Sequence, residues 1–358
     1  MDNRLLQIQN RKLAQSMESA NRDECSEEKR ALQLMLDRNS RMHSPSSVKN
    51  GREFHVRAND IFVSTYPKSG TTWMQFLAHN VRLLRENAFS DEENAMAFNE
   101  ITEKVPWDIL AEDCRGLGTI GGAQDLRAGQ SKTDPKNGLR LFKSHESVGT
   151  IAKRKEEGAM ARYVIVCRNP EDVFHSFHQF LPAYCGIDPK EISAETFCEA
   201  IFAGASHSGQ YWAWNMDWFK FAEKHREHVL MVCFEDMKED LASVIKKVAK
   251  LMGEDFISST DLKEMCRRGS FEYMREHKSK FDDHFVRNKV KKQMGIPDDA
   301  PEFSVGKVRE TGGKIGDGKE KLPESVRKRL EERWMEVFGK EGFDSYDSFR
   351  KRINEIWK

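Results

Sequence analysis

The sequence lacks any apolar run that approaches the ~20 residues of a membrane-spanning helix. Its start, residues 1–15, has no apolar core of a signal peptide. The seven cysteines are an odd number without Cys-x-x-Cys spacing, and Cys167 and Cys233 stand in apolar runs, where a free thiol behaves as a small hydrophobic side chain. These absences predict a protein of a reducing compartment, the cytoplasm, that does not act at a membrane.

A net charge is lacking as well. Lys and Arg together number 58, as do Asp and Glu, so the formal net charge at pH 7 is zero. Proteins that bind the backbone of nucleic acids usually carry a strong excess of basic residues. The sequence therefore predicts no nucleic-acid partner, while a local basic pocket for a small anion stays compatible with it.

Strand-like and helix-like segments alternate from residue 60 onward. Apolar runs predict strands at 61–65, 139–145, 161–167 and 228–234. Longer segments predict helices at 71–85, 170–180, 208–225, 241–253 and 322–339. Because the strand centres are apolar throughout, this alternation predicts an α/β fold with a central parallel sheet and helices on both faces.

The first 50 residues differ from the rest of the chain. Residues 1–38 are highly charged with weak helical periodicity, and the run 39–51 is rich in residues that break helices. We interpret residues 1–50 as a charged N-terminal extension and linker ahead of a domain that spans residues 51–358. A helix that lies on the domain is the alternative interpretation of the same pattern.

The junction between the first predicted strand and its helix reads STYPKSGTTW, residues 64–73. Unpaired N–H groups and the helix dipole favour an anion at a helix start, Gly70 permits close approach of the backbone, and Lys68 adds a positive charge. One helix cap needs a single hydroxyl, so the density of Ser and Thr exceeds what capping requires. The stretch predicts a P-loop-like site for a phosphate group.

Cationic side chains stand at the carboxyl ends of three predicted strands. Lys68 follows the first strand, Lys143 ends the second and Arg168 ends the third. Ligands of parallel α/β sheets bind beyond these ends, and the planar guanidinium of arginine suits a phosphate. The sequence thus predicts a pocket for a ligand with several negative charges, to which Ser176 can add a hydroxyl.

His145 stands two residues after Lys143, at the same predicted sheet edge. An imidazole titrates near neutrality and can act as a general base. A lone histidine is more often structural, but the position beside Lys68 and Arg168 favours catalysis. The glycine-rich stretch 306–319 is either a solvated loop or a loop that closes over a phosphate.

The order of residues in the first loop differs from an ATP-type P-loop, in which the lysine follows the glycines. ATP enzymes also need carboxylates for magnesium, and only Glu235 and Asp236 stand at a predicted strand end. A sulfonyl group carries less charge than a phosphoryl group, so a pair of lysines can replace the metal, and no metal is predicted. A nucleotide kinase-like phosphotransferase and a non-catalytic nucleotide-binding protein are the alternatives.

Four segments in this order resemble the cytosolic sulfotransferase family: TYPKSGTTW at 65–73, FKSH at 142–145, RNPEDVFHS at 168–176 and RETGGKIGDGK at 309–319. The resemblance spans about residues 55–340. It implies a sulfotransferase that moves a sulfonyl group from 3′-phosphoadenosine 5′-phosphosulfate (PAPS) to a hydroxyl or amine of a small-molecule acceptor.

The resemblance also implies roles for the matching residues. His145 would be the general base, and Lys68 and Lys143 would stabilise the charge that develops during transfer. The residues that would bind PAPS are, for the 5′-phosphosulfate, Lys68, Ser69, Gly70, Thr71 and Thr72; for the adenine region, Trp73, Phe234, Ser270 and Phe271; and for the 3′-phosphate, Arg168, Ser176, Arg309, Gly312 and Gly313.

The chain departs from the family pattern at several places. Phe234 stands where many relatives have a tyrosine, which removes one hydrogen bond to the cofactor region, and Gly318 replaces a tryptophan. The sequence that follows Gly318 does not match the usual dimer motif, so a homodimer is left open. Variable loops form the acceptor pocket, so the sequence does not identify the acceptor.

Overall fold

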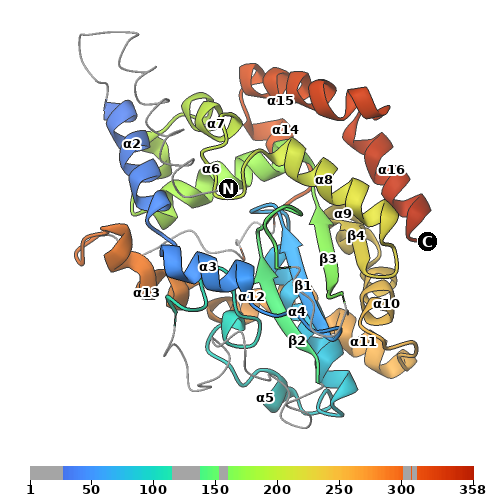
Figure 1. The fold of residues 1–358 in the computed structure, drawn as a ribbon. Coiled ribbons are helices and arrows are strands. Elements are labelled where there is room, and N and C mark those ends of the chain that lie inside the picture. Colours follow the sequence, from blue (N-terminus) through green and yellow to red (C-terminus); the bar gives the residue numbers. More distant parts are fainter. Residues whose placement is uncertain (1–26, 115–137, 153–159, 301–307, 309–312) are drawn as a thin grey trace.

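The computed structural model describes residues 27–114, 138–152, 160–300, 308 and 313–358 (Figure 1). Its sheet consists of β1(Asp60–Thr65), β2(Arg140–Ser144), β3(Arg162–Cys167) and β4(Val229–Cys233). The strands are parallel and lie in the order β2-β1-β3-β4. All four strands predicted from apolar runs are confirmed, as is the parallel sheet.

The helices of the described residues surround this sheet. They are α2(Glu27–Ser40), α3(Pro45–Glu53), α4(Thr71–Arg85), α5(Glu92–Ala95), α6(Pro170–Tyr184), α7(Ala194–Phe202), α8(Tyr211–Lys224), α9(Phe234–Glu239), α10(Leu241–Leu251), α11(Ser259–Arg268), α12(Phe271–Glu276), α13(His284–Met294), α14(Asp317–Lys321), α15(Glu324–Val337) and α16(Tyr346–Ile356). Short 3-10 turns are η1(Ile101–Glu103), η2(Pro189–Glu191), η3(Lys278–Lys280) and η4(Gly339–Glu341). The five helices predicted from the sequence are present.

Aromatic side chains cover one face of the sheet. Phe62 of β1 lies between Phe142 of β2 and Tyr163 of β3, with ring centroids 5.0 and 5.4 Å apart. Phe54, at the end of α3, packs on Phe142, and Trp218 of α8 packs on Tyr163. Each strand places alternate side chains on opposite faces, and α4 and α10 contact the strands as well as each other. Helices therefore cover both faces, as predicted.

The central position of β1 determines where the site can form. β2 pairs with one side of β1 and β3 with the other, so all three strands end at the same edge of the sheet. The loop after β1 lies between the two neighbouring strand ends. Side chains that follow β2 and β3 can therefore reach it from both sides.

Residues 27–53 form two helices that pack on the rest of the molecule. In α2 the apolar side chains of Leu32, Met35 and Leu36 are buried, and the Arg38 guanidinium donates to the Cys185 carbonyl at 2.8 Å. The stretch predicted as a linker contains α3 instead, because Ser44 caps the helix and Pro45 fits its first turn. This part of the chain follows the alternative interpretation; the boundary between residues 1–50 and 51–358 stays a prediction.

The segment between α4 and β2 also contains short elements. The structure contains α5 and η1 within it, and residues 106–108 pair with β2 through an isolated bridge between Trp107 and Lys143. None of the helices in the described ranges combines the length and the apolar character that crossing a membrane would require.

The close contact between α3 and the loop before β2 gives a test of this packing. A Cβ on Gly51 would lie 2.4 Å from the Asp108 carbonyl oxygen and 2.8 Å from the Ile109 Cα. Backbone atoms cannot move aside as a flexible side chain can, so we expect Gly51→Ala to lower the free energy of unfolding by about 1–3 kcal/mol. Urea unfolding of the purified protein measures the change.

Gly149→Ala is the matched control, because a Cβ there would meet only the Ser147 hydroxyl, at 3.6 Å. We expect its unfolding midpoint to stay close to that of the wild type. Equal midpoints for Gly51→Ala and Gly149→Ala would contradict the described docking of α3.

Candidate active site

A cavity of about 660 Å³ opens at the carboxyl ends of the strands. It is lined by these predicted site residues: Lys68, Gly70, Thr71, Thr72, Trp73, Lys143, His145, Arg168, Ser176, Phe234, Ser270, Phe271 and Gly313. Ser69 lies in the same loop and is buried. Arg309 and Gly312 lie outside the described residues. The structure thus brings together, around one cavity, residues that the sequence separates by more than 200 positions.

The loop after β1 turns sharply before α4 begins. Lys68 and Gly70 have left-handed backbones, with φ of 70° and 105°. A Cβ on Gly70 would lie 2.8 Å from the Phe234 ring, so both the conformation and the space favour glycine. The Ser69 hydroxyl is buried without a hydrogen-bond partner among the described residues. The loop therefore offers backbone N–H groups, a hydroxyl and an ammonium to an anion.

Lys143 ends β2 with its side chain only 1% exposed. Its ammonium lies 3.8 Å from the centroid of the Trp107 ring and 3.4 Å from the Asp283 carboxylate. Asp283 has a left-handed backbone, with φ of 63°, at the start of α13. These contacts hold the charged end of Lys143 at the cavity.

His145 follows β2 and forms one hydrogen bond that decides its protonation pattern. Its Nδ1 lies 2.8 Å from the Thr65 carbonyl oxygen of β1. A carbonyl can only accept, so Nδ1 carries the proton and Nε2 keeps a lone pair in the neutral ring. The edge of the Trp107 ring packs against the imidazole at 5.0 Å. The imidazole of His145 thereby has a defined orientation, with the lone pair on Nε2.

Arg168 follows β3 and approaches the loop from the other side. Its Nη1 donates to the Lys68 carbonyl at 3.1 Å, and its guanidinium lies 4.3 Å from the Phe234 ring centroid. The Nε is buried without a hydrogen-bond partner among the described residues. Burial lowers the pKa of Arg168 from its ordinary value. A buried, charged guanidinium of this kind gains from a bound anion.

Aromatic side chains line the part of the cavity beside α4. Trp73 packs edge-on against Phe234 at 5.6 Å, and its Nε1 donates to the Gly269 carbonyl at 2.8 Å. Ser270 caps α12, and Phe271 follows it at the cavity. Trp73, Phe234 and Phe271 thus give this part of the cavity an aromatic lining next to the cationic loop.

The two carboxylates considered for magnesium are engaged elsewhere. The Tyr346 hydroxyl donates to Glu235 at 2.5 Å, and the Arg350 guanidinium donates to Asp236 at 2.6 Å. Neither carboxylate lines the cavity. The position of these groups after β4 thus serves the packing of α16.

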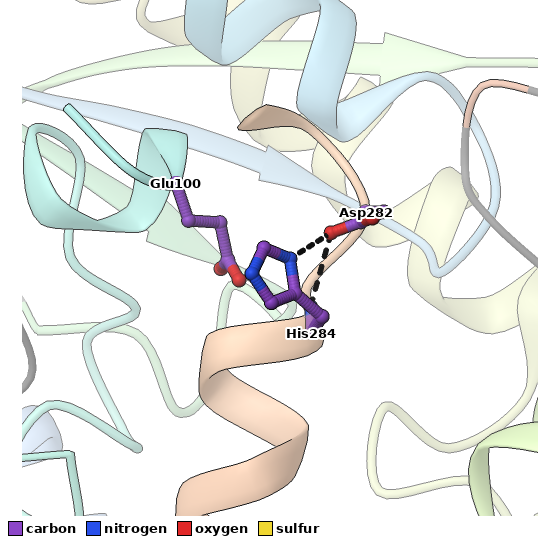
Figure 2. A group of neighbouring side chains, drawn as sticks. All are labelled: Glu100, Asp282 and His284. Carbon is purple, nitrogen blue, oxygen red and sulfur yellow. Dashed lines mark hydrogen bonds and ion pairs between the residues drawn. The ribbon is translucent and has the colours of Figure 1, made fainter. Parts of the chain in front are cut away.

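One group of described side chains has ligand types that could hold a metal ion: Glu100, Asp282 and His284 (Figure 2). The His284 ring lies between the two carboxylates and bonds to Asp282. Glu100 accepts from the Phe285 N–H at 2.8 Å and from the Thr102 hydroxyl. The protein's own donors thus occupy these oxygens, and the contacts fix the start of α13, from which Asp283 reaches Lys143.

Several residues at the cavity were missed by sequence reasoning: Trp107, Asp283, His43 and His207. Trp107 and Asp283 contact Lys143 from loops without a recognisable motif. His43 lies between α2 and α3, in the stretch predicted as a linker. No local signal marks these residues, since their roles follow from long-range packing.

Comparisons with known proteins agree with this geometry. A family model described as "Sulfotransferase domain" matches residues 58–339. "Cytosolic sulfotransferase 14" of Arabidopsis thaliana is 25% identical over 223 residues, 60% of each chain, so the match spans three fifths of that relative. "Sulfotransferase 1B1" of the dog is 29% identical over 64% of this chain and 70% of its own.

A solved structure supports the fold. The crystal structure of retinol dehydratase in a complex with retinol and PAP is similar with a TM-score of 0.56 and 21% sequence identity. The similarity covers 82% of this chain and 86% of that one. The family match covers most of the sequence, including the loop after β1 and the residues after β2 and β3. This protein therefore belongs to the sulfotransferase domain family.

Proposed function

We propose that this protein transfers a sulfonyl group from PAPS to a hydroxyl or amine of a small-molecule acceptor. The observation that carries the proposal is the convergence of Lys68, Lys143, His145 and Arg168 on one cavity from three adjacent strand ends. Family membership supports the same reaction. The retinol dehydratase structure was solved with PAP, the desulfated form of the donor.

The residues present fit such a donor. The buried Ser69 hydroxyl and the Arg168 Nε lack hydrogen-bond partners among the described residues, and both belong to residues that would bind phosphate groups in this proposal. The loop from Lys68 to Thr72 would hold the 5′-phosphosulfate, and Arg168 and Ser176 the 3′-phosphate. The adenine would lie against Trp73, Phe234, Ser270 and Phe271, which line the cavity. Gly313 lines the cavity and suits a contact to the 3′-phosphate.

When bound, PAPS supplies a sulfonyl group joined to a phosphate leaving group. His145 would take the proton of the acceptor at Nε2, since the Thr65 carbonyl holds the proton on Nδ1. The ammonium groups of Lys68 and Lys143 would stabilise negative charge on the transferred and leaving oxygens. Asp283 would keep Lys143 charged and oriented before the ligands enter.

The other end of the cavity suits a small, mainly apolar acceptor. Phe177, Phe180, Leu181 and Tyr184 of α6 line it, together with Met42. Apolar side chains of this kind remove the apolar surface of a bound acceptor from water. A few polar groups then determine the orientation of the acceptor. We expect a cytoplasmic location, in line with the plant relative's name. A homodimer stays a prediction.

Ligand choice tests the donor. PAP should raise the melting temperature without magnesium, because a ligand that binds only the folded state stabilises it by mass action. ATP with magnesium should give a smaller shift. Thermal unfolding with each nucleotide, with and without EDTA, measures this; a shift that needs ATP and magnesium, with none from PAP, would overturn the proposal.

Arg168 tests the 3′-phosphate site. We expect Arg168→Ala to weaken PAP binding by about 2–3 kcal/mol, the scale of lost charge-assisted hydrogen bonds. The affinity for adenosine 5′-phosphate should fall less. This ligand has no 3′-phosphate, so the variant loses only the hydrogen bond from Arg168 to the Lys68 carbonyl. Isothermal titration measures both, with Arg333→Ala on the exposed face of α15 as the control. Equal losses for both ligands would separate Arg168 from the 3′-phosphate.

His145 tests catalysis. We expect His145→Ala to lower turnover by about 10²–10⁴-fold with PAP affinity near that of the wild type. Turnover of 4-nitrophenol, which is already partly ionised at neutral pH, should fall less than turnover of a primary alcohol, which depends on the base. Steady-state rates on both acceptors give the comparison, with the exposed His55→Ala as the control. Wild-type turnover of the alcohol would remove His145 from the mechanism.

A further inference from the structure

The acceptor end of the cavity contains polar residues that the proposed reaction does not use. His43, from the turn between α2 and α3, and His207, from the segment before α8, both line it. Glu146, directly after His145, and Arg52 of α3 lie behind them. We call these four residues the His43 cluster.

The His43 cluster is a continuous chain of contacts. The Arg52 guanidinium donates to both oxygens of Glu146, at 2.6 and 3.2 Å. The other end of the chain begins at His207, whose Nε2 lies 3.3 Å from Glu146 and whose ring stacks on His43 at 4.6 Å. The Glu146 side chain is 1% exposed, and a buried carboxylate needs a compensating charge. The Arg52 guanidinium supplies this charge within the cluster. The cluster therefore presents an oriented imidazole to the cavity without an uncompensated charge.

The main chain around His43 is held on both sides. The Gln293 amide donates to the Met42 carbonyl at 2.6 Å, and the Ser44 N–H donates to the Asp113 carboxylate at 2.8 Å. The His43 ring is 7% exposed, and its Nε2 has no hydrogen-bond partner among the described residues. A buried polar atom left unpaired destabilises the folded state. A ligand group that pairs with it recovers this free energy on binding.

The protonation state of His43 limits what that group can be. Burial, and then the neighbouring His207, hold the pKa of His43 well below its usual range, so the ring is neutral near pH 7. A neutral imidazole nitrogen either donates or accepts, depending on the tautomer. A hydroxyl pairs with it in both cases, whereas a carbonyl needs a donor and an ammonium needs an acceptor.

Trp107 connects this group to the reacting centre. Its ring packs edge-on against His43 at 5.2 Å and against His145 at 5.0 Å. Its own Nε1 is buried without a hydrogen-bond partner among the described residues. The two imidazoles thus lie against one indole ring, and a compact molecule can contact both.

We propose that His43 binds a second hydroxyl of the acceptor, so that this protein prefers small apolar diols, such as dihydroxybenzenes, over the corresponding mono-alcohols. This inference rests on the proposed function for the reacting hydroxyl, and it assigns a specificity role to a residue outside the segment that matches the family. His145 receives one hydroxyl, and His43 with Trp107 receives the other.

The test compares phenol with 1,2-, 1,3- and 1,4-dihydroxybenzene on wild type and His43→Phe. In the wild type, kcat/KM for the best diol should exceed that for phenol by about 10-fold, the scale of a buried hydrogen bond. His43→Phe keeps the ring stack and removes both nitrogens. It should abolish this preference while phenol turnover and PAP affinity stay within about twofold.

A second measurement does not depend on turnover. Quenching of tryptophan fluorescence in the PAP-loaded protein gives the dissociation constants of phenol and of the best diol. The ratio should be about 10 in the wild type and about 1 in His43→Phe. His225→Phe, at a histidine that stacks on Phe221 outside the cavity lining, should behave as the wild type.

Three outcomes overturn the inference: a wild type without diol preference, a preference that survives His43→Phe, or equal losses for phenol and diol. If His43→Phe fails to fold, the wild-type ratio and His43→Gln provide the test, because glutamine retains a hydrogen-bonding group. A wild-type preference that His43→Gln preserves supports the inference, and a preference that His43→Gln loses overturns it. PAP binding distinguishes this result from failure of the proposed function. If the proposed function is wrong, the wild type binds no PAP, whatever its affinity for diols.

Discussion

The carboxyl end of β1 and the loop after it orient cavity side chains from both neighbouring strands through backbone carbonyl groups. The Thr65 carbonyl accepts from His145, which follows β2, and the Lys68 carbonyl accepts from Arg168, which follows β3. A neutral carbonyl orients a donor without cancelling a positive charge. The site therefore stays cationic while its side chains are fixed. A shift of either strand in register would break these contacts and move His145 or Arg168 away from the loop after β1.

The parts of this arrangement that depend on local sequence could be predicted. Apolar runs mark the strands. Residues at or just beyond the strand ends, such as Lys68, Lys143 and Arg168, lie where parallel strands must end. The partners of these residues could not be predicted, because Asp283 and Trp107 reach Lys143 from distant loops. The N-terminal helices α2 and α3 were not predicted for another reason. Their buried apolar residues are few among charged ones, so the helical periodicity is weak.

The departure from the family pattern at Phe234 has a structural counterpart. The Phe234 ring fills the space above Gly70, packs on Trp73 and lies 4.3 Å from the Arg168 guanidinium. A tyrosine hydroxyl at this position would add a hydrogen bond, whereas the phenylalanine supplies only its ring face. The ring alone retains the contacts to Gly70 and Arg168. The absence of the tyrosine hydroxyl therefore removes one polar contact but does not change the shape of the cationic pocket.

Aromatic rings lie against all three cations of the site. Lys68 lies 3.6 Å from the Phe180 ring centroid, Lys143 lies 3.8 Å from that of Trp107, and Arg168 rests on Phe234. A ring face attracts a cation through its quadrupole and carries no net charge. Carboxylates also lie near two of these cations: Asp283 is 3.4 Å from the Lys143 ammonium, and Asp172 is 3.8 Å from the Arg168 guanidinium. The rings thus help to stabilise the buried positive charge before a ligand binds, and they do so without adding negative charge that would repel an anion.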